Sequence, residues 1–346
     1  MSNSVPELAK GSKVLVSGAS GFIAVHVVDE LLKDGFEVVG TVRSAAKGDY
    51  LKDLFKGKPF SYVIVEDIGK DGAFDEAVKG VQGVAHTASP FHLKADDPEE
   101  LIRPAVDGTI GILKSITKNG SDVKRVVVTS SVAAVAGDKT APYTYTEDDW
   151  NDVSIKIVEE KGKDADGGHK YRASKTLAEK AAWDYSKENN VSYGLSTINP
   201  PFVFGPILHQ VDKPESLNTS VANFYGILKG SKKEEDLPGP FGNWIDVREV
   251  ALAHVKALTV PEAVGERFII SAGPFCIQDL TESILSIAPD TPGVPKGKPG
   301  AAKETTDPSK MTVCSGAKAG KILGIKYRSI EDSAKDMYDS LKAKGW

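Results

Sequence analysis

Three side chains of this sequence have the types and spacing needed to move a proton to or from a carbonyl oxygen. Tyr171 and Lys175 are four positions apart, and Ser131 lies upstream in Thr129-Ser130-Ser131. On a helix, residues four apart share one face. A tyrosine titrates near pH 10, and an ammonium about 5 Å away at an effective dielectric of about 20 favours the phenolate by roughly 3 kcal/mol. We therefore expect Lys175 to lower the pKa of Tyr171 and Ser131 to donate to the carbonyl oxygen.

The Tyr-x-x-x-Lys spacing by itself is weak evidence. Ten tyrosines and at most 43 lysines among 346 residues give about one chance match. Two further pairs exist, Tyr225 with Lys229 and Tyr338 with Lys342. Only Tyr171 follows a strand ending in Ser130-Ser131, where open α/β sheets place their chemistry. The alternative interpretation is a buried tyrosine, a surface lysine and a serine turn.

A glycine-rich turn near the N-terminus is typical of a dinucleotide site. Gly18, Gly21 and Ala24 stand between an apolar run and an amphipathic stretch. Gly18 permits a tight turn, Gly21 lets the backbone approach a pyrophosphate, and the helix N-terminus supplies N–H donors. An ordinary tight turn is the alternative, but the place of this motif in the first β-α-β unit favours a nucleotide.

The end of the second expected strand indicates which dinucleotide binds. A carboxylate there would bind the ribose hydroxyls of NAD, whereas this chain has Arg43, with Lys47 one turn further on. A guanidinium binds a phosphate through paired hydrogen bonds. The sequence therefore predicts NADPH/NADP+ as the cofactor, with an unengaged surface arginine and lysine as the alternative.

The elements that must position these residues alternate along the chain. Apolar runs predict strands at Lys13–Ser17, Glu37–Thr41, Tyr62–Glu66, Val84–Thr87, Arg125–Thr129 and Tyr193–Ile198. Amphipathic stretches predict helices at Phe22–Lys33, Ser44–Phe55, Ala73–Lys79, Pro98–Lys118 and Lys170–Glu188. This alternation predicts an α/β fold of the Rossmann type, a doubly wound parallel sheet.

After Asn199 the pattern becomes less regular and richer in proline and glycine. We expect helices near Ser220–Leu228, Val247–Leu258 and Ile330–Lys342, and a strand at Arg267–Ser271. The predicted division is an NADP-binding Rossmann domain over residues 11–199, with a returning helix and strand near 244–271. Residues 200–346 form a smaller, mostly helical domain that caps the substrate.

Composition narrows the class of protein. The net charge of -5 and pI near 5.8 argue against nucleic acid or an anionic membrane as partner. Two cysteines without ligand spacing, scattered histidines and no long apolar segment predict no disulfide, no metal site and no membrane span. We expect a cytoplasmic protein, either a monomer or a homodimer.

Further segments carry a resemblance. They are Val16–Ala24, Arg43-Ser44 with Lys47, Glu66–Ile68, His86–Pro90, Thr129–Ser131, Tyr171 with Lys175, Glu179–Trp183, Asn199–Pro206, Leu217–Ser220 and Ile245–Arg248. In these the chain resembles the extended short-chain dehydrogenase/reductases, in the dihydroflavonol-reductase-like branch, and is most similar to fungal NADPH-dependent methylglyoxal and carbonyl reductases. It departs from them mainly between Ala133 and Gly168.

The resemblance implies a full set of cofactor contacts. Its residues are Gly18, Ala19, Ser20, Gly21, Phe22 and Ile23 on the pyrophosphate, Arg43 and Lys47 on the 2′-phosphate, Asp67 and Ile68 beside the adenine, Thr87, Ala88 and Ser89 on the ribose side, and Pro200, Val203 and Ser220 around the cofactor, with Tyr171 and Lys175 also in contact. Ser131, Tyr171 and Lys175 are then the catalytic set. Asp67 as a turn cap, Val203 as core and Ser220 as a helix-start residue stay open as alternatives. We expect Asp246-Val247-Arg248 to fasten the capping domain and His86 to be a packed strand residue.

The expected activity is NADPH-dependent reduction of aldehydes and ketones, such as methylglyoxal, diketones, aryl ketones and keto esters. The expected partner is therefore a small carbonyl compound in an apolar pocket drawn from Pro90, Phe91, Val132, Tyr143, Pro201 and Phe202. Two alternatives remain. One is an NAD-dependent nucleotide-sugar epimerase or dehydratase, which generally has an acidic residue in place of Arg43. The other is a non-catalytic NADP-binding protein, which would usually lack the Tyr171/Lys175 pair.

Overall fold

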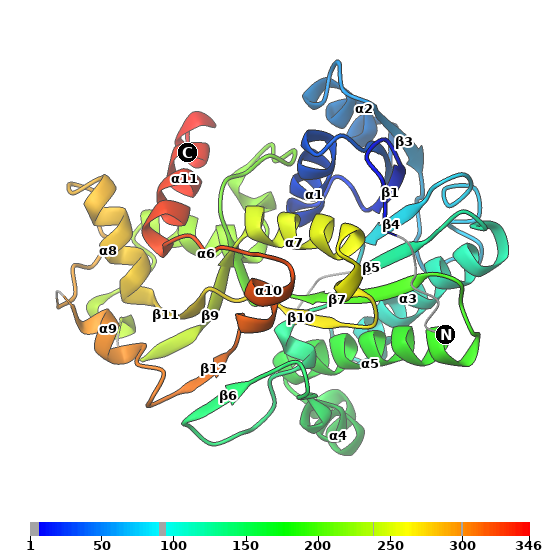
Figure 1. The fold of residues 1–346 in the computed structure, drawn as a ribbon. Coiled ribbons are helices and arrows are strands. Elements are labelled where there is room, and N and C mark those ends of the chain that lie inside the picture. The colour runs from blue at the N-terminus through cyan, green and yellow to red at the C-terminus, as the bar shows by residue number, and fades with distance from the viewer. Residues whose placement is uncertain (1–6, 90–94, 238, 299) are drawn as a thin grey trace.

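A seven-stranded parallel sheet forms the centre of the molecule (Figure 1). The computed structural model describes residues 7–89, 95–237, 239–298 and 300–346. Across the sheet the strands run β10 (Arg267–Ile269), β7 (Gly194–Asn199), β5 (Arg125–Thr129), β4 (Gly83–His86), β1 (Lys13–Ser17), β2 (Glu37–Val42) and β3 (Phe60–Ile64). The Rossmann-type parallel sheet predicted from the sequence is confirmed, and each predicted strand end lies within two residues of the observed one.

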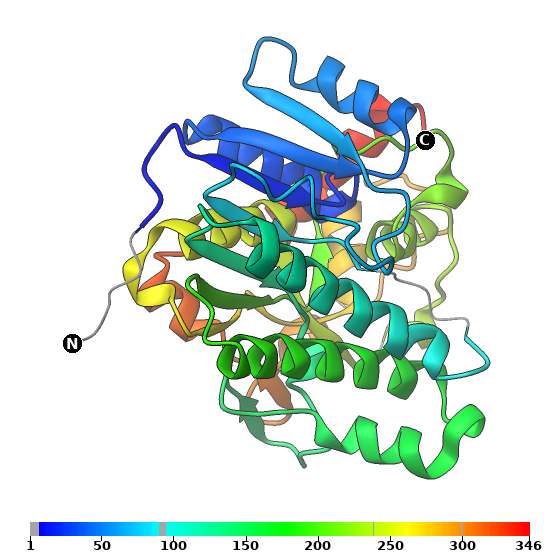
Figure 2. The ribbon, with the colours of Figure 1, turned by 90° about the vertical axis from the view of Figure 1, so that its right-hand side faces the viewer.

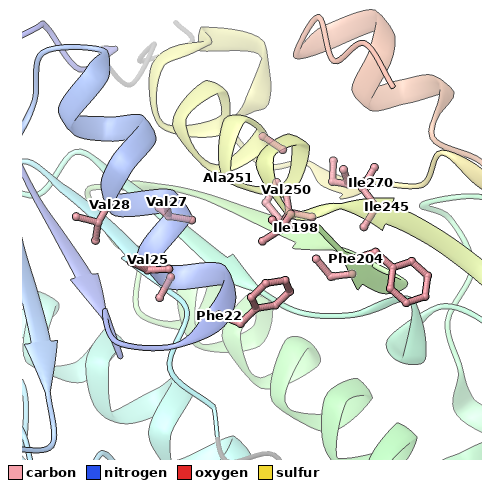
Figure 3. Packing of buried hydrophobic residues seen from close by; sticks show 14 of the residues in the cluster. Phe22, Val25, Val27, Val28, Ile198, Phe204, Ile245, Val250, Ala251 and Ile270 are labelled. Atoms are coloured by element: carbon pink, nitrogen blue, oxygen red, sulfur yellow. The ribbon is translucent and has the colours of Figure 1, made fainter. Parts of the chain in front are cut away.

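Helices cover both faces of this sheet, because its central strands are apolar on both sides. Helices α1 (Phe22–Lys33) and α7 (Val247–Thr259) pack together on one face. Figure 3 shows Val25 and Val27 of α1 and Val250 of α7 within a single buried cluster. On the other face, α3 (Glu99–Asn119) and α5 (Gly167–Glu188) lie side by side (Figure 2).

Strand β1 sits at the point where the order of the sheet reverses. It pairs with β2 on one side and with β4 on the other. Connections from β1 and β4 therefore leave in opposite directions, and open α/β sheets bind their ligands at such a point, at the carboxyl ends of the strands. Helix α2 (Ala45–Leu54) follows β2 at the same edge.

The second half of the chain adds a smaller layer with strands of its own. A three-stranded sheet contains β11 (Gly273–Cys276), β9 (Pro240–Asp246) and β8 (Phe202–Phe204), and β12 (Thr312–Cys314) pairs with β6 (Tyr143–Tyr145). The helices here are α6 (Thr219–Leu228), α8 (Ile277–Ile287), α9 (Ala301–Thr305), α10 (Ala317–Ile322) and α11 (Ile330–Ala343), while α4 (Asp152–Lys161) packs on α5. The strands β8, β9, β11 and β12 were not predicted, because each is short or interrupted by glycine and proline.

The predicted helix at Ala73–Lys79 is wrong. That segment forms successive hydrogen-bonded turns, with Ala73 N donating to Lys70 O and Asp75 N to Gly72 O. The hydrogen bonds from Ala73 N, Asp75 N and Lys79 N reach back three residues, whereas an α-helix needs successive bonds that reach back four. The buried side chains Phe74 and Val78 still pack against the sheet, which explains the helical spacing of the apolar positions.

None of the helices within the described ranges is both long and apolar enough to cross a bilayer. Cys276 and Cys314 are buried and unpaired.

Candidate active site

The turn between β1 and α1 is shaped for close approach of a ligand. Gly18 has φ +63, and a Cβ placed on it would lie 3.0 Å from the Cβ of Ala88, so only glycine fits without a shift. Gly21 is exposed, is the N-cap of α1 and has no side chain to cap the helix. The first N–H groups of α1 therefore have no side-chain cap, which suits the binding of an anion.

Neighbouring strands hold this turn in place. Gly18 N donates to Thr41 Oγ1 at 3.0 Å and Ala19 N donates to Thr41 O at 2.9 Å, which fixes the turn to β2. Thr41 was not among the residues singled out from the sequence, although it directly precedes Val42 and Arg43.

Ser17 joins the turns that follow β1 and β4. Its Oγ accepts hydrogen bonds from Thr87 N and Ala88 N, both at 3.0 Å, and lies 2.9 Å from His86 Nδ1. With both amides donating to it, the Ser17 hydroxyl donates to His86 Nδ1. Burial, with the charge of Lys175, lowers the pKa of His86 to about 3, so the ring is neutral. His86 is a packed strand residue, as expected.

Two basic residues stand where the second strand ends. Arg43 follows β2 and is exposed, and Lys47 lies half-buried in the first turn of α2. Both lie at the carboxyl edge of the sheet, on the same side as the glycine turn. Two cations there suit a phosphate better than a ribose hydroxyl.

The three candidate catalytic side chains converge, although they come from different elements. Ser131 begins the short 3-10 turn Val132–Ala134 just after β5, and its hydroxyl hydrogen-bonds to Tyr171 of α5. Lys175 lies one turn further along α5, with Nζ 5.8 Å from the centroid of the Tyr171 ring. Lys175 Nζ also donates to Ser89 Oγ at 2.9 Å. The arrangement presents a hydroxyl, a phenol and an ammonium to one place at the end of the sheet.

Burial sets the protonation of this group. It raises the pKa of Tyr171, and the hydrogen bond from Ser131 opposes that rise only in part. Burial also lowers the pKa of Lys175 to about 8. The expected net lowering of the Tyr171 pKa is therefore wrong for this structure, because burial of the phenol has the larger effect. The lysine has itself lost solvation.

The outer candidate residues have the following surroundings. Asp67 accepts a hydrogen bond from Gly69 N at 2.9 Å, which is the turn-cap alternative, and Ile68 packs towards Gly108 of α3. Val203 is buried in β8, and Ser220 at the start of α6 donates to Val203 O at 2.5 Å. Ser220 therefore holds the backbone of β8 in place.

The candidate substrate residues divide into three groups. Val132 N donates to Pro200 O at 3.1 Å, which places Val132 beside Pro201 near Ser131. Tyr143 lies on β6 and donates to Asp149 at 2.8 Å, and Phe202 packs on Phe275 with ring centroids 5.7 Å apart. Pro90 and Phe91 lie outside the described residues.

Asp246 and Arg248 join the start of α7 to the C-terminal helix. Arg248 Nη2 lies 2.8 Å from Asp246, and Arg248 Nη1 lies 2.5 Å from Asp336 of α11. These contacts hold the C-terminal helix α11 against the start of α7, in agreement with the fastening role expected from the sequence.

Comparison with known proteins identifies relatives along nearly the whole chain. Residues 14–273 match the NAD dependent epimerase/dehydratase family. The NADPH-dependent methylglyoxal reductase GRE2 of Saccharomyces cerevisiae is 39% identical over 336 residues, covering 93% of this chain and 96% of that protein. The ketoreductase azaE of Aspergillus niger is 37% identical, covering 95% of this chain and 97% of its own length.

A solved structure agrees with the sequence matches. The crystal structure of Gre2 from Candida albicans in complex with NADPH superimposes with a TM-score of 0.88 at 39% identity, covering 97% of this chain and 100% of that one.

Proposed function

Because the chain belongs to the NAD dependent epimerase/dehydratase family, also called the extended short-chain dehydrogenase/reductases, we propose that it is an NADPH-dependent reductase of aldehydes and ketones. The observation that carries the proposal is the convergence of Ser131, Tyr171 and Lys175 at the carboxyl edge of the sheet, close to the glycine turn. The full-length similarity to NADPH-dependent methylglyoxal reductase GRE2 and ketoreductase azaE supports it.

The chain's residues fit NADPH. The exposed N-cap Gly21 leaves the start of α1 without a side-chain cap, and the first turn of α1 holds no acidic residue that would repel a pyrophosphate. Arg43 and Lys47 are suited to the 2′-phosphate. When bound, NADPH supplies the hydride that a carbonyl reduction requires.

Each of the three central residues has a separate task. Ser131 donates to the carbonyl oxygen and holds it in place. Tyr171, kept protonated by a raised pKa, donates the proton that converts that oxygen to a hydroxyl. Lys175, fixed by Ser89, holds the ribose hydroxyls and stabilises negative charge on the phenol oxygen after the proton has left.

The remaining contacts belong to the same proposal. We place Gly18–Ile23 on the pyrophosphate, Asp67 and Ile68 beside the adenine, Thr87–Ser89 along the ribose side, and Pro200, Val203 and Ser220 around the cofactor. Val132, Tyr143, Pro201 and Phe202 would line the carbonyl substrate. Val132 and Pro201 have the strongest support, because they lie beside Ser131.

The proposal also divides the chain. Residues 11–199 bind the dinucleotide, together with the returning segment 244–271, since β10 pairs with β7 and α7 packs on α1. Residues 200–346 cap the substrate and include the three-stranded sheet. Two unpaired cysteines suit a reducing compartment such as the cytoplasm.

The experiment is the loss of NADPH absorbance with a carbonyl panel of methylglyoxal, diketones, aryl ketones and β-keto esters. Turnover of at least one class, with the alcohol identified by chiral chromatography, supports the reductase. No turnover of any class at high enzyme concentration refutes it. A dinucleotide that survives dialysis, or a thermal shift with a UDP-sugar, would instead favour an epimerase.

A further inference from the structure

Glu179 is a buried carboxylate that the proposed mechanism does not use. It lies on α5 one turn beyond Lys175 and is 1% exposed. Within the described residues, both of its oxygens accept hydrogen bonds. Oε2 accepts from Ser130 Oγ (2.5 Å) and Asn199 Nδ2 (2.7 Å), and Oε1 accepts from Arg267 Nε (2.6 Å), Thr197 Oγ1 (3.0 Å) and Trp183 Nε1 (3.4 Å).

The Oε2 side of this carboxylate leads directly to the catalytic serine. Ser130 is the residue before Ser131, and Asn199 Nδ2 donates its second hydrogen bond to Ser131 O at 3.2 Å. Two groups adjoining Ser131, one along the chain and one across the sheet, are thus held by the same oxygen atom. Because the Ser131 hydroxyl must reach both the substrate oxygen and Tyr171, a shift of the Ser131 backbone would misplace this hydroxyl.

On the Oε1 side, Arg267 compensates the negative charge of Glu179. Arg267 is 8% exposed, pairs with Glu179, and stacks on the Trp150 ring with its guanidinium carbon 3.6 Å from the centroid. A buried carboxylate without such a partner would be strongly unfavourable. The ion pair therefore allows an acceptor with a full charge to sit behind the strand end that bears Ser131.

We propose that Glu179 is a positioning residue, which fixes the backbone of Ser131 through Ser130 and Asn199 and so orients the serine hydroxyl for the carbonyl oxygen. The inference rests on the proposed function, because it needs Ser131 to act on the substrate. It goes beyond that function by assigning a role in the reaction to a residue that touches neither cofactor nor substrate.

The substitution Glu179→Gln keeps the contact with Arg267 but changes the contacts with Ser130 and Asn199. The amide oxygen of glutamine stays with Arg267, since the charged donor binds it most strongly, and the amide NH2 then faces Ser130 and Asn199. The Ser130 hydroxyl can rotate to accept, whereas Asn199 Nδ2 has only hydrogens to offer. Asn199 must turn to present its oxygen, and its bond to Ser131 O is lost.

The experiment is a double-mutant cycle between Glu179→Gln and Ser131→Ala, with kcat, KM and the Kd for NADPH measured for each variant. We expect Glu179→Gln to lower kcat by about ten- to a hundredfold and to leave the Kd for NADPH within about twofold. In the Ser131→Ala background the same change should alter kcat by less than about twofold, because the hydroxyl it orients is gone. Trp183→Phe, which removes only the longest contact to Oε1, is the matched control and should leave kcat unchanged.

Two results would overturn the inference. One is an unchanged kcat in Glu179→Gln, and the other is an equal loss in the presence and absence of the Ser131 hydroxyl, which would indicate a general structural effect. If Glu179→Gln does not fold, Asn199→Ala, which keeps the Glu179–Arg267 pair, is taken through the same cycle with the same criteria. A wild-type enzyme that reduces no carbonyl would refute the proposed function itself. An active wild-type enzyme in which the effects of Glu179→Gln and Ser131→Ala are additive would refute only the role of Glu179.

Discussion

Lys175 and Tyr171 share one face of α5, with the lysine Nζ 5.8 Å from the centroid of the tyrosine ring. Burial acts on the two groups in opposite directions, because it disfavours the charged form of each. It raises the pKa of Tyr171 and lowers that of Lys175 to about 8. For carbonyl reduction this is useful. In the proposed reaction the phenol would keep the proton that it gives to the substrate, and the ammonium on the same helix face would stabilise the phenolate formed in that step.

Tyr171→Phe should therefore abolish most of the turnover without weakening cofactor binding. Removing a positioned proton donor costs about 10²- to 10⁴-fold in rate, so kcat should fall by that factor while the Kd for NADPH stays within about twofold. Tyr338→Phe is a matched control, because Lys342 Nζ also lies 5.8 Å from the ring centroid of Tyr338, on a helix remote from Ser131. Steady-state kinetics and fluorescence titration provide the measurements. A fully active Tyr171→Phe enzyme would rule out its role as the proton donor.

Arg43→Ala tests the choice between NADPH and NADH. A hydrogen bond to a charged group contributes about 1.5–3 kcal/mol, so the Kd for NADPH should rise about ten- to a hundredfold while the Kd for NADH hardly changes. Lys52→Ala is the control, since Lys52 is an exposed cation on α2 away from its first turn. Equal losses for both cofactors would show that Arg43 does not contact the 2′-phosphate.

Gly18→Ala should damage both folding and cofactor binding. The new Cβ would lie 3.0 Å from the Ala88 Cβ and 3.1 Å from its Cα, at φ +63. Gly80→Ala separates the two causes, because Gly80 has φ +68 but nothing within 4 Å of the added atom. We expect Gly80→Ala to cost about 1 kcal/mol from backbone strain alone, and Gly18→Ala to cost more and to abolish NADPH binding. Urea unfolding and cofactor titration measure both effects, and equal stabilities with intact binding would contradict the close contact.

Much of the fold could be predicted because the apolar runs are long and regularly spaced. Strands such as Arg125–Thr129 are buried along nearly their whole length, and the order of the sheet follows from repeated β-α-β units. The helix predicted at 73–79 is wrong because Phe74, Ala77 and Val78 have helical spacing yet pack from turns. In the smaller sheet, β8 has only three residues, and β9 and β11 contain glycine and proline, so no regular apolar run stands out.

The candidate site could be predicted only where a local pattern carries the chemistry. Tyr171 and Lys175 lie within one motif, and the glycine turn lies within another. Glu179 has no such local signal apart from its spacing of four from Lys175, since its partner Arg267 is 88 positions away. Pairings of that kind are made by the topology of the sheet. The rise in the Tyr171 pKa was missed for a related reason, because the effect of a nearby charge can be estimated from sequence spacing whereas the effect of burial cannot.

Lys175→Met should stabilise the cofactor-free protein against unfolding at neutral pH, while it abolishes catalysis. A lysine whose pKa falls from 10.5 to about 8 on folding releases its proton more readily in the native state than in the unfolded state. Between pH 8 and 10.5 the unfolded chain therefore binds more protons, so the wild type gains stability as pH rises through that window. Below pH 8 the full cost of burying the charge applies.

Methionine avoids this cost at similar length, so Lys175→Met should raise the free energy of unfolding at pH 7 by about 1–3 kcal/mol, less what the Ser89 hydrogen bond contributes. The advantage should shrink towards pH 10.5. Urea unfolding at pH 7 and pH 9.5 measures it, with Lys342→Met on α11 as the exposed control. A difference that stays constant with pH, or a less stable Lys175→Met protein at pH 7, would show that the lysine is not held in the desolvated state that the structure indicates.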